Sequence, residues 1–410
     1  MAGRIQAPRG TFDVLPDDGR RRAALRQSCE ELLAAAGYGP IETPIFESTE
    51  LFARGVGETT DIVQKEMFTF EDQGGRSLTL RPENTAGVCR AYLEHGMHKL
   101  PQPVKLWYLG PFFRHEAPQA GRYRQFNQIG IEAIGSLEPS LDAEVILLLA
   151  ELLERAGARG VRLRISSLGT PETRRAYSDE LRAYLRQHES QLSEEVRSRI
   201  DANPLRAFDA DHPGTRTVMV EAPKLLDRLS ADDAEHFREV LTLLDDAGQP
   251  YDVDAALVRG IDYYTRTVFE FTSDALGAQS GVGGGGRYDG LIEELGGPST
   301  PGVGFAAGIE RILLVSQAES QQEAPDVYVA RDAGASGREA FGLLRDARGR
   351  GLRAQMEQAG RSLKGQLKHA DRIGAQWVLI VTGNGLRVRN MRTGDQQEAA
   401  SADEALRMIG

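Results

Sequence analysis

The alternation of apolar and polar positions is clearest in two runs separated by a polar loop, at residues 106–114 and 124–134. In the second run Gln128, Gly130 and Glu132 alternate with apolar residues. Successive side chains of a strand point to opposite faces of a sheet, so this period of two places the three on one face. The pattern predicts a β-hairpin with a polar face, where the central glycine leaves room for a ligand.

Helical and strand patterns bounded by capping and breaking residues cover most of the chain up to residue 316. A charged helical pattern fills residues 171–250, which contain no site-like cluster and are expected to form an inserted lobe. The other expected elements are helices at 18–36 (capped by Asp17 or Asp18), from Pro82 to Gly96, from Ser140 to Gly157 and from Ile309, and strands at 78–81, 253–271 and 301–308.

A second domain is expected after a polar linker at residues 317–325. Strand and helix patterns alternate from residue 326 to residue 410, which is typical of a small α/β domain. We therefore predict a large domain over residues 1–316 that contains the helical insertion, followed by the linker and the small domain.

Composition excludes several classes of protein. No apolar run approaches the roughly 20 residues of a membrane span, and the N-terminus has no apolar stretch typical of a signal peptide. Cys29 and Cys89 are the only cysteines, which argues against a disulfide framework and for a reducing compartment. No set of Cys and His residues has metal-ligand spacing. We expect a cytoplasmic protein with no membrane partner and no structural metal.

Charge is distributed unevenly along the chain. The net charge of −11 is not typical of a nucleic-acid-binding protein. Residues 326–410 nevertheless carry 14 Lys and Arg against 10 Asp and Glu, a net charge of +4, whereas the rest carries 35 against 50, a net charge of −15. A basic C-terminal region (the basic tail) after an acidic remainder of the chain (the acidic body) suits a polyanion that is contacted at one place. A net charge of +4 over this length also lies within the normal variation among proteins.

Polar residues crowd the start of a strand in the sequence R-G-I-D-Y-Y-T-R-T-V-F-E-F, which begins at Arg259. So many hydrogen-bonding side chains at the entrance of a strand indicate a polar ligand, and the alternative is an exposed edge strand. The hairpin loop holds Arg114, Arg122 and Arg124, a cluster that can bind phosphates. The alternative for this loop is a solvated segment paired with Glu116.

Two charged residues are expected at helix N-termini. Glu83 is favoured there by the helix dipole, which gives it a structural explanation. Arg311 is disfavoured in a first turn, so a functional role explains it better, although Glu310 beside it offsets the penalty.

The run G-V-G-G-G-G-R-Y-D-G at residues 281–290 formally contains G-x-G-x-x-G, but no βαβ unit opens with it and it lacks G-K-[ST]. A turn and strand whose backbone approaches a ligand explain it better than a dinucleotide site or a flexible linker.

The collected residues include no Ser-His-Asp order, thiol nucleophile or zinc set. Arginine clamps without a protein nucleophile suit phosphoryl or nucleotidyl transfer.

Five motifs carry a resemblance to a known family. G-Y-G-P-I-E-T-P-I-F-E, F-R-H-E with R-Y-R-Q-F-N-Q-I-G-I-E, and G-V-G-F-A-A-G-I-E-R-I-L-L are similar to motifs 1, 2 and 3 of the class II aminoacyl-tRNA synthetases. L-V-R-G-I-D-Y-Y-T-R-T-V-F-E-F and G-G-G-G-R-Y-D-G-L resemble the two histidine-specific motifs of the histidyl-tRNA synthetase family. The chain resembles that family over nearly its full length.

The resemblance implies a fold, partners and a reaction. The fold is α+β, with a six-stranded antiparallel sheet flanked by helices and a C-terminal α/β anticodon-binding domain. The protein would be a homodimer with Pro44 at its interface. It would attach L-histidine to tRNA(His), using ATP with bound Mg²⁺ and a histidyl-adenylate intermediate.

The resemblance also implies residue roles. The catalytic residues would be Arg259, on the histidine carboxylate and the α-phosphate of ATP, and Arg114, on the same phosphate. Histidine would be bound by Glu83, Thr85 and Gln128 at the α-amino group, by Glu132 and Tyr264 at the imidazole, and by Tyr263 as support. The ATP-binding residues would be Arg114, Arg122, Arg311 and Glu116.

The tail departs from the family pattern and two alternative functions stay open. The turn from Thr382 to Leu386 is shorter than expected, as is the stretch before Arg361, where a strand would normally lie.

One alternative is a catalytically inactive, synthetase-like regulatory subunit of ATP phosphoribosyltransferase, but such proteins lose the arginine-bearing motif and the C-terminal domain. The other is a class II synthetase for a different amino acid, against which Glu132 with Tyr264 favours an imidazole.

Overall fold

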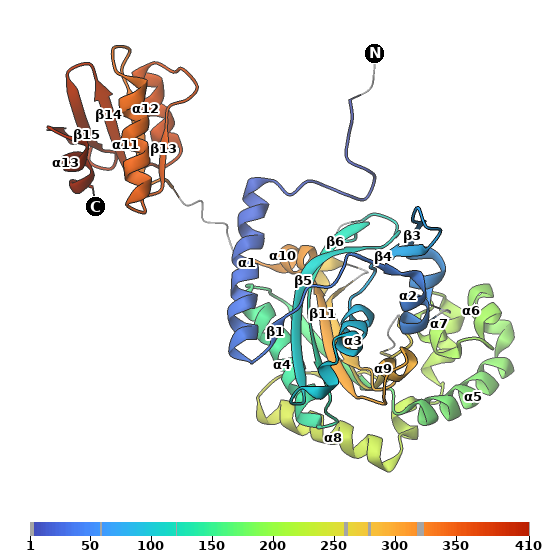
Figure 1. Cartoon of the computed structure of the whole chain (residues 1–410). Helices are drawn as coiled ribbons and strands as arrows, with labels where there is room; N and C mark the ends of the chain where they lie inside the picture. The colour runs from blue at the N-terminus through green and yellow to red at the C-terminus, as the bar shows by residue number, and fades with distance from the viewer. Residues whose placement is uncertain are drawn as a thin grey trace. The chain divides into compact units, whose positions relative to one another are not determined.

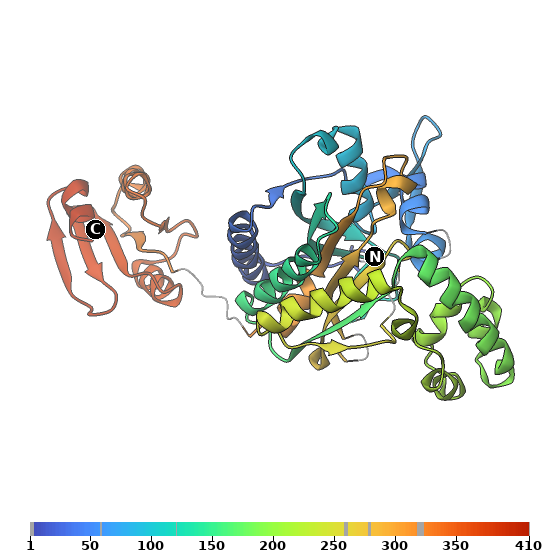
Figure 2. The same cartoon turned by 90° about the horizontal axis from the view of Figure 1, so that it is seen from below.

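The protein is described by a computed structural model over residues 4–57, 60–119, 121–257, 261–277, 280–317 and 324–409. The chain divides into two compact units, residues 1–320 and 321–410. The first is an α+β unit around one large sheet, and the second is a smaller α/β unit (Figures 1 and 2). Within the described ranges, no helix combines the length and apolarity needed to cross a membrane.

The first unit is built on an eight-stranded sheet in the order β1-β5-β6-β11-β10-β9-β7-β8. Its six inner strands pair antiparallel throughout, and the two short outer strands pair parallel. The inner six form the antiparallel sheet that the resemblance implied. The strands are β1 (Gly39–Pro40), β5 (Val104–Phe113), β6 (Gln125–Ile134), β11 (Gly302–Gly308), β10 (Gly281–Arg287), β9 (Thr265–Ser273), β7 (Val161–Ser167) and β8 (Asp252–Val253).

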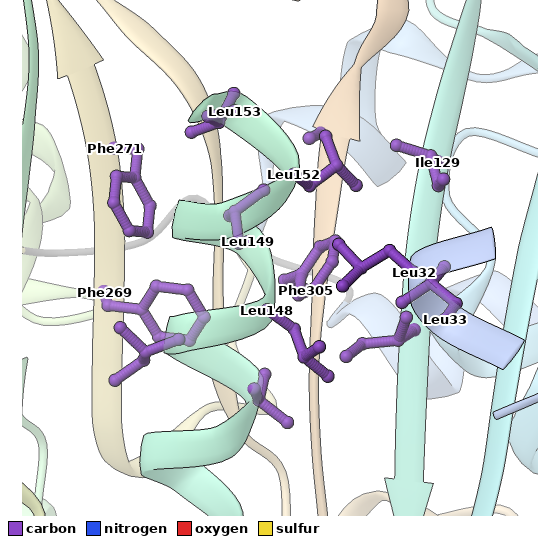
Figure 3. Close-up of a cluster of buried hydrophobic side chains, with 14 of the residues drawn as sticks. Leu32, Leu33, Ile129, Leu148, Leu149, Leu152, Leu153, Phe269, Phe271 and Phe305 are labelled. Carbon is purple, nitrogen blue, oxygen red and sulfur yellow. The ribbon is translucent and has the colours of Figure 1, made fainter. Parts of the chain in front are cut away.

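One face of this sheet is apolar and is covered by four helices, α1 (Pro16–Ala35), α4 (Pro139–Arg155), α8 (Ala231–Asp246) and α10 (Ile309–Val315). Four leucines of α4 at helical spacing form a stripe that crosses the sheet. Each buried Leu or Phe contributes about 1.5–3 kcal/mol, so this face anchors the strands. Figure 3 shows the contact, with Leu148, Leu149, Leu152 and Leu153 among Phe269, Phe271, Phe305 and Ile129.

The opposite face carries the polar side chains of the hairpin and is covered by α3 (Thr85–Glu94) and α9 (Leu291–Glu294), and α2 (Thr49–Val56) packs on these two helices. A three-stranded sheet, β2-β4-β3, lies beside them: β2 (Phe46–Ser48), β4 (Ser77–Leu80) and β3 (Phe68–Glu71). The predicted insertion contributes α5 (Pro171–Gln187), α6 (Glu194–Arg199) and α7 (Pro213–Val220) before α8 returns to pack on α4.

Two helix starts differ from the sequence predictions. Both α1 and α4 begin with a proline at the first position, Pro16 and Pro139. The fixed φ of proline suits that position, where no backbone N–H is needed. Asp17 and Asp18 therefore lie in the first turn of α1, and Ser140 is the second residue of α4 rather than its cap.

The second unit is a five-stranded mixed sheet in the order β13-β12-β14-β15-β16, with α11 and α13 on one face and α12 on the other. A short strand does precede Arg361, as β13, which pairs parallel with β12. The elements are β12 (Val327–Arg331), α11 (Gly337–Gly349), β13 (Ala354–Met356), α12 (Leu363–Arg372), β14 (Trp377–Thr382), β15 (Gly385–Asn390), β16 (Gln396–Ala399) and α13 (Ala402–Arg407).

Candidate active site

The hairpin of β5 and β6 has the polar face that the sequence predicted. Tyr108 pairs with Gly130, and Gln128 and Glu132 lie on either side of that glycine. Directly paired residues share a face of the sheet, so Tyr108 joins the amide and the carboxylate. A Cβ at position 130 would lie 2.4 Å from the Tyr108 ring. Glycine is therefore needed to admit the tyrosine.

Two adjoining cavities open on this face. The tyrosine cavity, of about 280 Å³, is lined by four tyrosines and the start of α3. The arginine cavity, of about 200 Å³, is lined by three arginines and by the glycines of β10. Residues common to both walls are Arg114, Arg122, Gln128, Gly284 and Ala306. A single ligand complex can thus contact both sets of side chains.

Glu83 lies two residues before the first residue of α3, and its side chain caps the helix. Its carboxylate accepts hydrogen bonds from the backbone N–H groups of Thr85, at 2.7 Å, and Ala86, at 3.1 Å. The prediction that Pro82 begins this helix was wrong, because the carboxylate occupies the first free N–H groups and the helix starts at Thr85. The Tyr263 hydroxyl lies 3.5 Å from the same carboxylate. Burial raises the pKa of Glu83, while the two backbone donors lower it.

Glu132 lies beneath the floor of the tyrosine cavity. Its carboxylate accepts hydrogen bonds from the hydroxyls of Tyr288 at 2.6 Å, Thr85 at 2.8 Å and Tyr108 at 3.3 Å. A Cβ on Gly304, which lines the cavity, would lie 2.2 Å from this carboxylate. Burial raises the pKa of Glu132 to about 8, although the hydroxyl donors act in the opposite direction.

Tyr263 and Tyr264 both line the tyrosine cavity and are buried. Their ring centroids lie 4.8 Å apart in an edge-to-face arrangement, which orients one ring by the other. They lead into β9, an inner strand, so the alternative of an exposed edge strand was wrong. Arg259, predicted in the same motif, lies outside the described residues.

Gln128 reaches both cavities from β6. Its Oε1 atom is buried and has no hydrogen-bond partner among the described residues. Because a buried amide oxygen without a partner costs free energy, this atom is suited to accept a hydrogen bond from a ligand.

Two arginines of the hairpin loop reach the arginine cavity. Arg114 donates from Nε to the carbonyl of Pro82 at 2.9 Å, and its guanidinium lies 5.5 Å from the centroid of the Phe126 ring. The Nη1 atom of Arg122 pairs with Glu116 at 2.9 Å. The pairing with Glu116 is therefore present, and all three side chains nevertheless line the cavity.

Arg311 lies in the first turn of α10, as predicted, and lines the arginine cavity. Its Nε atom donates to the carbonyl of Gly281. Burial and the nearby charge of Arg122 lower its pKa. Glu310 instead accepts from the backbone N–H of Asn127, at 3.0 Å, and pairs with Arg22.

The glycine run forms the inner strand β10 rather than a dinucleotide loop. A Cβ on Gly285 would lie 1.9 Å from the carbonyl oxygen of Gly304 on the next strand. Gly284 lines both cavities. The run therefore consists of glycines for two reasons. The neighbouring strand β11 packs closely against it, and the cavities lie next to it.

Sequence reasoning assigned no site role to Tyr108, Tyr288 or the buried pair behind them. The Arg287 side chain is fully buried, pairs with Asp142 of α4 and contacts Asp289 at 3.2 Å. Tyr108 shares the parity of the polar face, and Arg287 and Tyr288 stand in the glycine-rich motif. The sequence therefore contained a signal for each of these residues. Their partners could not be recognised, because Glu132 and Asp142 lie far from Tyr288 and Arg287 in sequence.

Comparisons with known proteins identify the family. A family model described as Histidyl-tRNA synthetase matches residues 10–312. The chain belongs to the histidyl-tRNA synthetase family. Among similar curated proteins, one named Histidine--tRNA ligase from Desulforamulus reducens is 48% identical, covering 96% of each chain. Another with that name, from Rubrobacter xylanophilus, is 46% identical and covers 97% of each chain.

Solved structures of this family have the same fold. The apo histidyl-tRNA synthetase of S. aureus superposes with a TM-score of 0.82 at 36% identity, covering 99% of this chain and all of that one. A Bacillus halodurans structure described as an ATP phosphoribosyltransferase regulatory subunit/histidyl-tRNA synthetase gives a TM-score of 0.68 over 93% of this chain. Its 23% identity supports the shared fold alone.

Proposed function

We propose that this protein attaches L-histidine to tRNA(His) in two steps. A carboxylate oxygen of histidine attacks the α-phosphorus of ATP, forming histidyl-adenylate and releasing pyrophosphate. The 3′-hydroxyl of the terminal tRNA adenosine then attacks the adenylate carbonyl, forming the ester and releasing AMP. The membership of the family and the names of its relatives support this reaction.

The tyrosine cavity is proposed to bind histidine. The Glu83 carboxylate, the Gln128 amide and the tyrosine hydroxyls of its lining suit the α-amino group and imidazole of that amino acid, which both carry N–H donors. Glu132 and Tyr264 would bond the imidazole, and Tyr263 would support them. Glu83, Thr85 and Gln128 would bond the α-amino group.

The arginine cavity is proposed to bind ATP, with Mg²⁺ entering as part of the substrate. Arg114, at the wall common to both cavities, would contact the α-phosphate, where negative charge increases in the transition state. Arg122 and Arg311 would contact the γ-phosphate, with Arg311 also against adenine and Glu116 holding Arg122. Arg259 would contact the histidine carboxylate and the α-phosphate.

The observation that carries this proposal is that Arg114 lines both cavities. A cavity lined by the buried carboxylate of Glu83 adjoins one with three cationic side chains, so an amino acid and a polyphosphate can meet at Arg114. No covalent intermediate on the protein is required, because the bound substrates react with each other.

Histidine-dependent exchange between ATP and pyrophosphate tests the proposal. The protein alone should catalyse this exchange with L-histidine and not with the other amino acids. Analogues that lack the imidazole nitrogens should be rejected by about 10⁴-fold, because the buried polar groups of the site would lose their partners. A regulatory subunit of ATP phosphoribosyltransferase would show no exchange, and a different synthetase would respond to another amino acid.

Replacement of Arg259 tests the assigned chemistry. Arg259→His should abolish the exchange while the circular-dichroism spectrum and thermal unfolding stay unchanged, because only the cation at the reacting groups is altered. Arg155→His, on the exposed surface of α4, is the matched control. Retained exchange in Arg259→His would refute the assigned role.

We also infer that the protein is a homodimer and that its two domains have separate functions. Pro44 is exposed, and the apolar Ile45, Phe46 and Phe70 beside it are 43–47% exposed, which supports burial by a second copy. Sedimentation should give twice the chain mass.

Residues 1–316 would be the catalytic domain, with the insertion at about 171–250, followed by the linker at 317–325. Residues 326–410 would bind the anticodon, in a protein located in the cytoplasm.

A further inference from the structure

The first helix of the insertion reaches the chain segment that carries the tyrosine pair. Arg174 lies in the first turn of α5, and its Nη1 atom donates to two backbone carbonyls, of Asp262 at 3.0 Å and of Tyr264 at 2.8 Å. These carbonyls flank Tyr263 in sequence. One guanidinium nitrogen therefore holds the backbone on both sides of that tyrosine.

The surroundings of Arg174 are unusual for an arginine on a helix. Burial lowers its pKa, whereas the charges of Asp262 and Glu294 act in the opposite direction. A guanidinium stays charged in proteins, and burying a charge is unfavourable unless it makes good hydrogen bonds. Burial of the Arg174 guanidinium is therefore unfavourable by itself. Its hydrogen bonds among the described residues are those to the two carbonyls of the tyrosine segment, and they offset this cost.

The insertion also holds the chain just after the tyrosine pair. Arg266 has a positive φ of 45°, a conformation that a residue with a side chain keeps only when its surroundings hold it. Its backbone N–H donates to the carbonyl of Gly169 at 2.8 Å, and its Nε atom donates to Asp233 of α8 at 3.1 Å. Two helices of the insertion, α5 and α8, and Gly169 just before it therefore hold the segment that contains Tyr263 and Tyr264.

We propose that Arg174 is a positioning residue for histidine binding, through which the insertion fixes Tyr263 and Tyr264 in the tyrosine cavity. This inference rests on the proposed function, which places histidine in that cavity. Arg174 lines neither cavity, but the tyrosines of the segment that it holds line the tyrosine cavity and not the arginine cavity. Its loss should therefore affect histidine far more than ATP.

The test compares Arg174→Met, Arg174→Lys and the control Arg175→Met in the full-length protein. Arg175 is the next residue of α5 and is exposed. In the exchange assay, Arg174→Met should raise the KM for histidine at least about tenfold and change the KM for ATP less than about twofold. Arg174→Lys should recover part of this loss, because an ammonium still donates to carbonyls. Arg175→Met should match the wild type.

The ratio of the two KM changes decides the inference. Equal increases for histidine and ATP, or a lower melting temperature with an unchanged KM for histidine, would make Arg174 a structural brace and overturn it. If Arg174→Met does not fold, the same ratio in Arg174→Lys decides. A wild-type protein without histidine-dependent exchange would overturn the proposed function. Active wild type with unaffected Arg174 variants would overturn this inference alone.

Discussion

At the scale of single residues, the sequence identifies which side chains share a face but not how each is ionised. The period of two placed Gln128 and Glu132 together, and the register of β5 and β6 confirms that placement. The protonation of Glu132 depends on its burial under residues from α3, from β11 and from the position after β10. Those contacts are tertiary, so no local pattern contains them.

The raised pKa of Glu132 predicts a pH-dependent stability. In the folded protein this carboxyl titrates at about 8 rather than at its ordinary value of 4.5. Folding therefore takes up a proton between these values, and the contribution of Glu132 is complete below pH 4.5 and is lost as pH rises through 8. Glu132→Gln cannot ionise, so its free energy of unfolding should rise relative to wild type by about 3–5 kcal/mol between pH 5 and pH 9.

Urea unfolding at pH 5, 7 and 9 measures this difference. Glu154→Gln, on the exposed surface of α4, controls for the exchange of a glutamate for a glutamine outside the cavity. Parallel stability curves for wild type and Glu132→Gln across this range would contradict the prediction.

At the scale of elements, the sequence predicted the long hairpin, most helices and the strand at 301–308. The β structure expected over residues 253–271 was only partly right, because the described residues between β8 and β9 form turns and loop. Helix starts were less predictable, because proline and a capping carboxylate compete for the first turn, as at α1 and α3. The pair of Arg287 with Asp142 could not be predicted, since it joins β10 to α4 across 145 positions. Arg174 was missed for the same reason, because its partners lie 88 and 90 positions away.

The buried ion pair predicts an uneven cost of substitution. Both side chains are fully buried, so Arg287→Met should lower the free energy of unfolding by about 3–5 kcal/mol, because Asp142 is left as an uncompensated charge. Adding Asp142→Leu should recover much of this loss. Arg155→Met, which breaks the exposed pair with Glu151, should change stability by less than about 1 kcal/mol.

Denaturant unfolding of the wild type, Arg287→Met, Asp142→Leu and the double variant completes the double-mutant cycle, with Arg155→Met as the separate control. A loss below about 1 kcal/mol for Arg287→Met would mean that the pair does not anchor β10 to α4. A double variant no more stable than Arg287→Met would show that the loss comes from packing of the guanidinium rather than from the unpaired carboxylate.

At the scale of the whole molecule, charge and core structure divide the chain in the same way. Residues 326–410 carry a net charge of +4 and the rest carries −15. Each unit has hydrophobic clusters of its own, so each can fold without the other. In the proposed function, a polyanion such as tRNA would be repelled by the acidic body and attracted to the basic tail.

A protein that ends at residue 320 should therefore separate the two steps of the proposed reaction. Its ATP–pyrophosphate exchange should keep a KM for histidine within about threefold of wild type, because both cavities lie in the first unit. Its KM for tRNA should rise at least about tenfold, and that KM should depend less steeply on salt, because each lost cation removes a phosphate contact. Steady-state charging at 50 and 200 mM salt measures both, with the full-length protein as control. Unchanged tRNA kinetics after truncation would show that the acidic body alone binds the nucleic acid.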